Sequence, residues 1–193
     1  GVNRIALEEI KALRKQGLFI AKGPYYKGVI LFSENKYKEA KKEFEKILIG
    51  DNSVYLTPEE TGNLAMKYIS SLYQLENIDE FKKMAKAMID DISKSDHPAM
   101  SAPLERILYL YIESLSSEKK PNGQLLSNAI STFKDKFASS SYLSRVKFLE
   151  AKDFIYQNKS EQGKEILNSI INDEKSPNYL KELSKTELSS LEI

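Results

Sequence analysis

The segment from Pro24 to Leu48 carries small and aromatic residues at intervals that suit two helices packed closely together. Its hydrophobic residues recur with helical spacing on both sides of a turn at residues 34–36. Gly28 lies twelve positions before Ala40, and Phe44 follows one helical turn after Ala40. Small residues at the first two positions let antiparallel helices approach closely, and the aromatic ring then closes the pair against its neighbour. This segment therefore predicts a tight helical hairpin.

The remainder of the chain also has helical periodicity, and no run alternates with a period of two for long enough to suggest a sheet. Clusters of Gly, Pro, Asn and Asp predict breaks at residues 17, 23–24, 50–52, 96–98, 120–123 and 175–177. The predicted helices cover residues 3–16, 24–34, 36–49, 58–75, 78–92, 102–117, 122–137, 141–157, 160–173 and 177–190. The sequence therefore predicts an all-α protein.

Capping residues mark several of the predicted helix starts. Thr57 precedes Pro58, and Glu60 follows three positions after Thr57, which predicts a capping box. The same reasoning predicts helix starts at Asn77 with Glu80, at Ser160 as a cap, and at Ser176-Pro177.

The predicted helices pair naturally along the chain. The pairs 24–49, 58–92, 102–137 and 141–173 are interpreted as four antiparallel hairpins about 34–44 residues apart, the range of helical-repeat solenoids. The helix at 3–16 would cap one end and the helix at 177–190 the other, because an end repeat otherwise exposes its apolar stacking face. We therefore expect a single helical-repeat domain over residues 1–193.

The first hairpin resembles the tetratricopeptide repeat (TPR). That repeat has a small residue at its eighth position, Ala at its twentieth and an aromatic residue at its twenty-fourth, and Gly28, Ala40 and Phe44 occupy these positions here. The fourth hairpin keeps the spacing, since Ala151 lies twelve positions before Gly163. The resemblance implies a TPR-like solenoid of about four hairpins with capping helices.

The other two hairpins depart from the repeat pattern. In the second, Phe81 falls where Ala is expected and Ala85 where the aromatic is expected, so a large and a small residue have exchanged places. The third has Ala129 and Phe133 in its second helix, but its turn is longer than the pattern. Residues 156–191 are similar to the closing helices of periplasmic TPR proteins, which implies a lipoprotein or membrane-anchored scaffold in a bacterial cell envelope.

Composition argues against several classes of protein. The 29 basic and 28 acidic groups give a net charge of +1, whereas nucleic-acid-binding domains normally carry a basic excess. Cysteine is absent, which excludes disulfides and thiolate metal sites and suits a bacterial envelope compartment. No segment is long and apolar enough for direct membrane insertion. Because the chain does not begin with Met, we expect a native signal or anchor upstream of Gly1.

No motif indicates catalysis, metal binding or a cofactor. The only histidine, His97, lies in a turn without a positioned partner. Adjacent carboxylates at residues 8–9, 59–60 and 90–91 point about 100° apart on a helix and do not converge on one atom. No H-E-x-x-H, EF-hand, G-x-G-x-x-G or P-loop sequence occurs. We therefore expect no catalytic residue, no metal and no cofactor.

The resemblance to the TPR also implies where a partner would bind, because the first helix of each TPR hairpin lines the concave face. The implied groove residues are Tyr25, Val29 and Phe32 in the first hairpin, Met66, Ser70 and Tyr73 in the second, and Arg145, Phe148, Lys152 and Ile155 in the fourth. Packing between helices is the alternative for each of them. The TPR clamp for a free carboxylate has Lys and Asn where this chain has Tyr25 and Val29, which favours an apolar or mixed ligand.

These observations favour a non-catalytic protein–protein interaction scaffold that binds a protein or peptide on its concave face, in the periplasm or otherwise associated with the envelope. Three alternatives stay open. They are an enzyme that uses a helical superhelix with an unrecognised carboxylate site, a cytoplasmic TPR adaptor, and a homo-oligomer in which the first helix packs on another copy.

Overall fold

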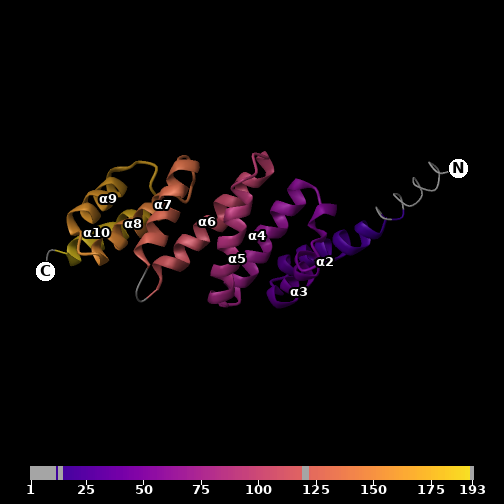
Figure 1. Ribbon diagram of the computed structural model, residues 1–193. Coiled ribbons are helices and arrows are strands. Elements are labelled where there is room, and N and C mark those ends of the chain that lie inside the picture. The colour runs from indigo at the N-terminus through magenta and orange to yellow at the C-terminus, as the bar shows by residue number, and fades with distance from the viewer. Residues whose placement is uncertain (1–11, 13–14, 119–121, 192–193) are drawn as a thin grey trace. The chain divides into compact units, whose positions relative to one another are not determined.

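The computed structural model describes residue 12 and residues 15–118 and 122–191. Within these residues every regular element is helical and no strand occurs, so the prediction of an all-α protein is confirmed (Figure 1). The α-helices are α2 (Gly23–Ser33), α3 (Tyr37–Leu48), α4 (Pro58–Gln74), α5 (Ile78–Ile92), α6 (Ser101–Ser116), α7 (Gly123–Lys136), α8 (Leu143–Tyr156), α9 (Ser160–Asn172) and α10 (Asn178–Ser190). Their ends agree with the predicted helices to within two residues. The sequence does not predict the π-helix Leu18–Lys22 or the 3₁₀-helices Asn52–Tyr55 and Pro98–Met100.

The chain divides between Ile107 and Leu108, inside α6, into two compact units. In the first unit α2 packs on α3 and α4, and α4 also packs on α5. In the second unit α8 packs against α7 and α9, and α10 packs against both α8 and α9. The core of this second group consists of Phe148, Ala151, Leu167, Ile170 and Leu180. The predicted single domain over residues 1–193 stays a prediction.

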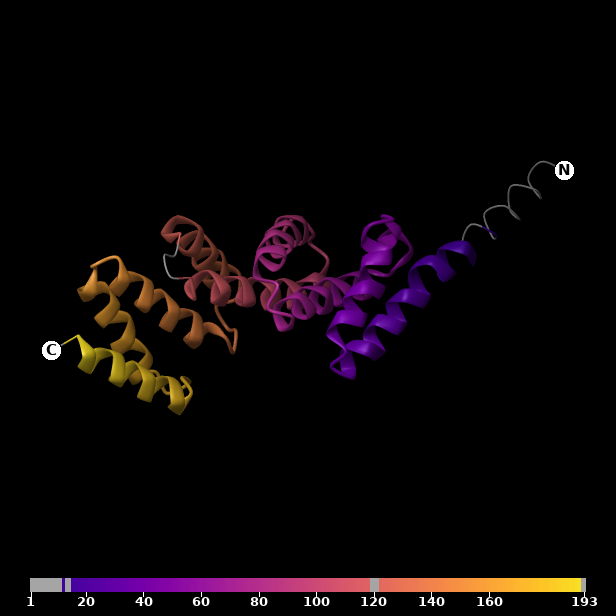
Figure 2. The same ribbon diagram turned by 90° about the horizontal axis from the view of Figure 1, so that it is seen from below.

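The first described helix runs through both sites where the sequence predicts a break. Residues 15–17 are helical, the π-helix follows, and α2 continues from it without interruption (Figure 2). The breaks predicted at Gly17 and Gly23-Pro24 are therefore wrong. Pro24 has no N–H to donate and its ring crowds the preceding turn, and the wider π turn directly before it accommodates both constraints. The predicted helix at 3–16 lies almost entirely outside the described residues.

Three hairpin turns share one backbone geometry. The α2–α3, α4–α5 and α8–α9 turns each contain one residue with positive φ: Asn35 (60°), Glu76 (55°) and Asn158 (60°). The following residue donates its N–H to the carbonyl oxygen five positions earlier, as in a Schellman motif: Lys36 to Leu31 (2.9 Å), Asn77 to Leu72 (3.3 Å) and Lys159 to Phe154 (2.8 Å). Glu76 lies 41 positions after Asn35, and Asn158 lies 82 positions after Glu76. The turns therefore recur with a period of 41 residues, which is longer than the ~34 residues of a TPR.

Side chains at this 41-residue interval are buried in the same way. On the second helices, the fully buried residues at this interval are Phe44, Ala85, Leu126 and Leu167. On the first helices, the buried residues at this interval are Gly28, Ile69, Leu110 and Ala151. The large Ile69 and small Ala85 replace the small Gly28 and large Phe44, so the combined volume of the two side chains stays similar.

Two glycines mark the closest approach of paired helices. A Cβ atom added at Gly28 would lie 2.4 Å from the Phe44 ring, and one added at Gly163 would lie 2.6 Å from Ile155 and 3.0 Å from the carbonyl oxygen of Ala151. Real Cβ atoms essentially never approach another atom to under 3.0 Å. The close contacts predicted within the first and fourth hairpins are therefore confirmed.

The predicted helix caps have mixed outcomes. The capping box of Thr57 and Glu60 is present, and so is the proline at the first position of α4. Asn77 precedes α5, but its side-chain amide bonds the Glu80 carboxylate and not a backbone N–H. The predicted cap at Ser160 is wrong, because Ser160 is already the first helical residue of α9. Both helices follow a Schellman turn, which carries the chain into the helix within two residues and leaves no extended capping residue.

The hairpin contact predicts coupling between two substitutions. We expect Gly28→Ala to force the buried Phe44 ring to move, which costs about 1–3 kcal/mol of unfolding free energy. In a Phe44→Leu background the same change should cost at least about 0.5 kcal/mol less. The double variant would have Ala and Leu at this contact, and the fourth hairpin has the same combination in Ala151 and Leu167. The gain in helix propensity of about 1 kcal/mol is common to both backgrounds and cancels.

Urea unfolding of the wild type, both single variants and the double variant measures this coupling. Strictly additive effects would show that Gly28 and Phe44 do not constrain each other.

Candidate functional site

The first helices of the two hairpins in the first unit lie side by side and run in the same direction. The residue pairs that connect them are Lys22 with Glu60, Tyr25 with Asn63, and Phe32 with Lys67. The pairs occur in the same order along both helices, which defines a parallel alignment. This alignment brings the predicted groove residues of α2 and α4 onto neighbouring helices.

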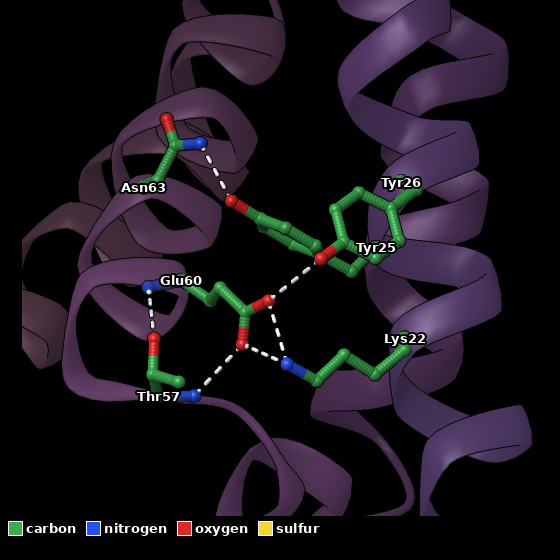
Figure 3. Close-up of polar contacts among 6 residues, drawn as sticks. All are labelled: Lys22, Tyr25, Tyr26, Thr57, Glu60 and Asn63. Atoms are coloured by element: carbon green, nitrogen blue, oxygen red, sulfur yellow. Dashed lines mark hydrogen bonds and ion pairs between the residues drawn. The ribbon is translucent and has the colours of Figure 1, made fainter.

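Glu60 is the centre of a polar network at the start of α4 (Figure 3). Its carboxylate accepts hydrogen bonds from the Lys22 ammonium at 2.7 Å, from the Tyr26 hydroxyl at 3.1 Å and from the backbone N–H of Thr57 at 2.8 Å. The Thr57 hydroxyl accepts a bond from the Glu60 N–H at 3.3 Å, which completes the capping box. One carboxylate therefore caps α4 and joins it to the preceding helix.

The hydrogen bonds of this network keep the Glu60 carboxylate and the Lys22 ammonium in their charged forms. Burial alone raises the pKa of Glu60, but hydrogen bonds from Lys22, Thr57 and Tyr26 to the charged form outweigh burial, so this pKa lies below its ordinary value. The hydrogen bond to Glu60 raises the pKa of Lys22 above its ordinary value. The contact between the two side chains is therefore an ion pair at neutral pH.

Most of the predicted groove residues in the first unit are half-buried. Tyr25 differs, because it is only 6% exposed and its hydroxyl accepts a 2.7 Å hydrogen bond from the Asn63 amide, which leaves little surface for a partner (Figure 3). The half-buried residues, called here the α2–α4 strip, are Val29, Phe32, Met66, Ser70 and Tyr73. Each of these side chains therefore keeps part of its surface accessible.

Aromatic contacts fix the orientation of the rings in the α2–α4 strip. The Phe32 and Tyr37 rings meet edge to face with centroids 5.4 Å apart, and the Lys67 ammonium lies 4.5 Å from the Phe32 centroid. Tyr73 meets the fully buried Phe81 ring at 5.3 Å. Burial lowers the pKa of Lys67. The rings are thus held in place before any partner binds.

In the second unit the predicted residues separate into surface and core. Lys152 is exposed, and Arg145 is half-buried with its guanidinium 5.7 Å from the Phe148 ring centroid. Phe148 is only 5% exposed and belongs to the core, which leaves little of its ring for a partner. Ile155 is half-buried and packs against the same core.

A cluster of tyrosine and charged side chains near Arg145 is not among the predicted sites. The Tyr109 and Tyr142 rings stack with centroids 4.4 Å apart and planes at 16°. The Tyr109 hydroxyl donates to the Glu113 carboxylate at 2.9 Å, and that carboxylate lies 3.8 Å from the Arg145 guanidinium. Of these contacts, only the one between Tyr109 and Glu113 is predictable from the sequence, because residues four positions apart are neighbours on a helix.

The first unit also contains an apolar groove of about 540 Å³ that the sequence does not predict. Its apolar lining residues are Leu48, Leu64, Ala65, Ala87, Met88, Ile92 and Met100. Asp51, Asp91 and Lys94 also line it. Methionine side chains adapt easily to different apolar partners. The two methionines come from separate segments, so only the folded chain reveals their proximity.

Asp153 is a buried acid of the second unit, and the sequence analysis does not select it. It is 8% exposed and lines two cavities, of about 200 Å³ and 280 Å³. The Gln157 amide donates to its Oδ2 oxygen at 2.7 Å, whereas the buried Oδ1 oxygen has no hydrogen-bond partner among the described residues. Burial raises the pKa of Asp153, and the bond from Gln157 offsets this only in part.

In the part of the chain that the structure describes, no group of three or more His, Cys, Asp or Glu residues is placed to hold a metal ion. No helix in this part has the length and hydropathy needed to cross a membrane. His97 lies in an exposed turn, as predicted, and its Nδ1 accepts a hydrogen bond from the Ala99 N–H at 3.2 Å. In comparisons with protein-family models, curated proteins and solved structures, nothing matches this chain.

The Glu60 network predicts a pH-dependent contribution to stability. We expect Glu60→Gln to lower the free energy of unfolding by about 1–2 kcal/mol at pH 7, because it weakens the cap and removes the ion pair with Lys22. The folded pKa of Glu60 is lowered, so its contribution is present above the unfolded pKa and is lost as the pH falls through the folded pKa. The difference between wild-type and variant urea curves should therefore shrink as the pH falls from the unfolded pKa through the lower folded pKa.

Glu59→Gln is the matched control, since Glu59 is exposed and lies in the same helical turn. It removes the same charge near the helix dipole without breaking the contact to Lys22. The pKa of Glu59 is lowered as well, by hydrogen bonds from its own backbone N–H and from Thr57. Equal losses in both variants would therefore mean that the contact of Glu60 with Lys22 adds nothing beyond the interactions of a carboxylate with the helix start.

Proposed function

We propose that this protein is a non-catalytic scaffold that binds a segment of another protein along the first helices of its hairpins. The observation that carries the proposal is the parallel α2–α4 pair with its strip of half-buried, mainly apolar and aromatic side chains. Rings that are already held in place lose little conformational freedom on binding. Aromatic residues also contribute most of the affinity in many protein interfaces.

We propose further that the fold is TPR-like, with about four hairpins and capping helices. The close contacts at Gly28 and Gly163, the parallel first helices and the repeated turns support this proposal. Leu180 of α10 is 1% exposed in the core of the second unit, as suits a helix that caps the last hairpin. The 41-residue period is longer than that of the ~34-residue TPR, and residues 49–57 and 93–100 form long connections between successive hairpins.

The proposed location is the bacterial envelope, either periplasmic or held there by an anchor. The absence of cysteine and the similarity of residues 156–191 to the ends of periplasmic TPR proteins support this location. A cytoplasmic adaptor with the same fold is the alternative. The sequence of the complete gene, together with cell fractionation, distinguishes the two, because a signal or lipidation site is directly readable.

The strip predicts a separation of binding from stability. We expect Phe32→Ala and Tyr73→Ala each to weaken partner binding by about 1–3 kcal/mol, or roughly 5- to 150-fold. Because both rings are half-buried, the loss of stability should be smaller than the ~3–5 kcal/mol typical of a fully buried aromatic. A pull-down identifies the partner, and calorimetry with melting curves then measures both quantities.

Two further variants make the test specific. Tyr179→Ala removes a 59% exposed ring on α10, outside the strip, and should leave binding unchanged. Met88→Lys places a charge in the apolar groove of the first unit. If only Met88→Lys abolishes binding, the apolar groove is the interface and the assignment of the α2–α4 strip is wrong.

A further inference from the structure

Lys67 is a half-buried lysine of the first unit that has no carboxylate partner among the described residues. Lys22 and Lys41 are also half-buried, but Lys22 lies 2.7 Å from the Glu60 carboxylate and Lys41 lies 2.8 Å from the Glu45 carboxylate. Burial lowers the pKa of Lys67, and no described acidic group counteracts this shift. The Lys67 ammonium is therefore a positive charge that the described residues leave uncompensated.

This charge lies among the residues of the α2–α4 strip. On α4, Lys67 directly follows Met66 and comes three positions before Ser70. Its ammonium lies 4.5 Å from the centroid of the Phe32 ring on α2. An aromatic ring attracts a cation through its electron-rich face, but the ring carries no net charge. A partner segment that covers the Phe32 ring therefore also removes water from the Lys67 ammonium.

We propose that Lys67 selects partner segments that carry an Asp or Glu side chain beside the apolar residues that contact the strip. This inference rests on the proposed scaffold function and specifies the chemistry of the partner. An ammonium group that is covered without an anion loses its hydration and gains no charge in return, which is costly. A carboxylate at this place supplies a charged hydrogen-bond partner, and the exclusion of water by the apolar neighbours strengthens their attraction.

The surroundings of Lys67 favour one side-chain carboxylate over a polyanion. Lys22 and Lys27 precede Phe32 along the same continuous helix, and each already pairs with a carboxylate of the chain, at 2.7 Å and 2.8 Å. Nucleic acids and anionic membranes are bound by several cations at once, because their charges are closely spaced. The phosphate of a phosphopeptide is recognised best by clustered arginines. Lys67 supplies a single compact charge beside an aromatic ring, which suits an acidic residue next to an apolar one.

The test is a selection on the full chain from a phage-displayed library of random dodecapeptides. Peptides that bind the wild type and fail to bind Phe32→Ala depend on the strip, and we expect them to contain Asp or Glu. Each is synthesised with an amidated C-terminus in two forms, one as selected and one with the acidic residue replaced by its amide. Calorimetry on the wild type should show at least about fivefold weaker binding of the amide form, as expected for loss of an ion pair that the complex partly buries.

Two variants assign the preference to one side chain. Lys67→Gln should bind both forms of each peptide equally, because the positive charge that distinguishes them is gone. Lys83→Gln removes an exposed charge from α5 and should keep the full preference. Equal binding of both forms to the wild type, or a preference that survives in Lys67→Gln, would overturn the role of Lys67. Both forms are compared on the same protein, so a change in stability affects them equally.

The outcomes also separate this inference from the scaffold proposal on which it rests. Phe32-dependent peptides without acidic residues would leave the α2–α4 strip as the interface and overturn only the role of Lys67. Recovery of no Phe32-dependent peptide would overturn both. A phosphoserine counterpart that binds more than about tenfold tighter than the acidic peptide would show that the site recognises phosphate and that the assignment to a carboxylate is wrong.

Discussion

The close approach of two antiparallel helices at Gly28 and Phe44 is the contact on which the first hairpin depends. The Phe44 ring of α3 lies so close to the α2 backbone that a Cβ atom at Gly28 would clash with it. The ring then fills the space between the helices and is fully buried. Because the two helices are fixed in this way, an adjoining face of α2 aligns with α4, and Phe32 there contacts both Tyr37 of α3 and Lys67 of α4. Local packing thus determines which side chains of α2 remain partly accessible.

Much of this fold is predictable because its signals are local. Helix ends, the Gly28–Phe44 contact and the Thr57 capping box all depend on residues within one hairpin turn or one helix pair. The error at Gly23-Pro24 has a physical cause, since a π turn allows a helix to pass a proline that normally ends it. The apolar groove and the buried Asp153 arise where separate segments meet, so sequence spacing alone does not reveal them.

Regularity along the chain is weakest in the third hairpin. Ala40, Phe81 and Gly163 occupy one position of the 41-residue repeat in the other hairpins. In the third hairpin this position is Asn122, an exposed residue that caps α7. Phe32, Tyr73 and Ile155 occupy a second such position, which is Ser114 in the third hairpin. Ser114 is buried, and its hydroxyl has no hydrogen-bond partner among the described residues. Polar residues at packing positions cost stability, and such departures are expected at functional sites. The cavity next to Asp153 includes Leu126 of the same irregular hairpin.

In the proposed interface the half-buried rings would serve both packing and recognition, which would limit the substitutions that such a surface tolerates. Tyr73 rests on the buried Phe81, and Ile155 contacts the corresponding position at Gly163. Tyr73 meets the larger Phe81 edge to face, whereas glycine at the corresponding position lets Ile155 pack directly on the backbone of α9. Specificity for a partner would then follow from the pairing of first- and second-helix residues in each hairpin. Exchange of one member alone would disturb the core, so paired substitutions are the ones able to alter recognition without loss of the fold.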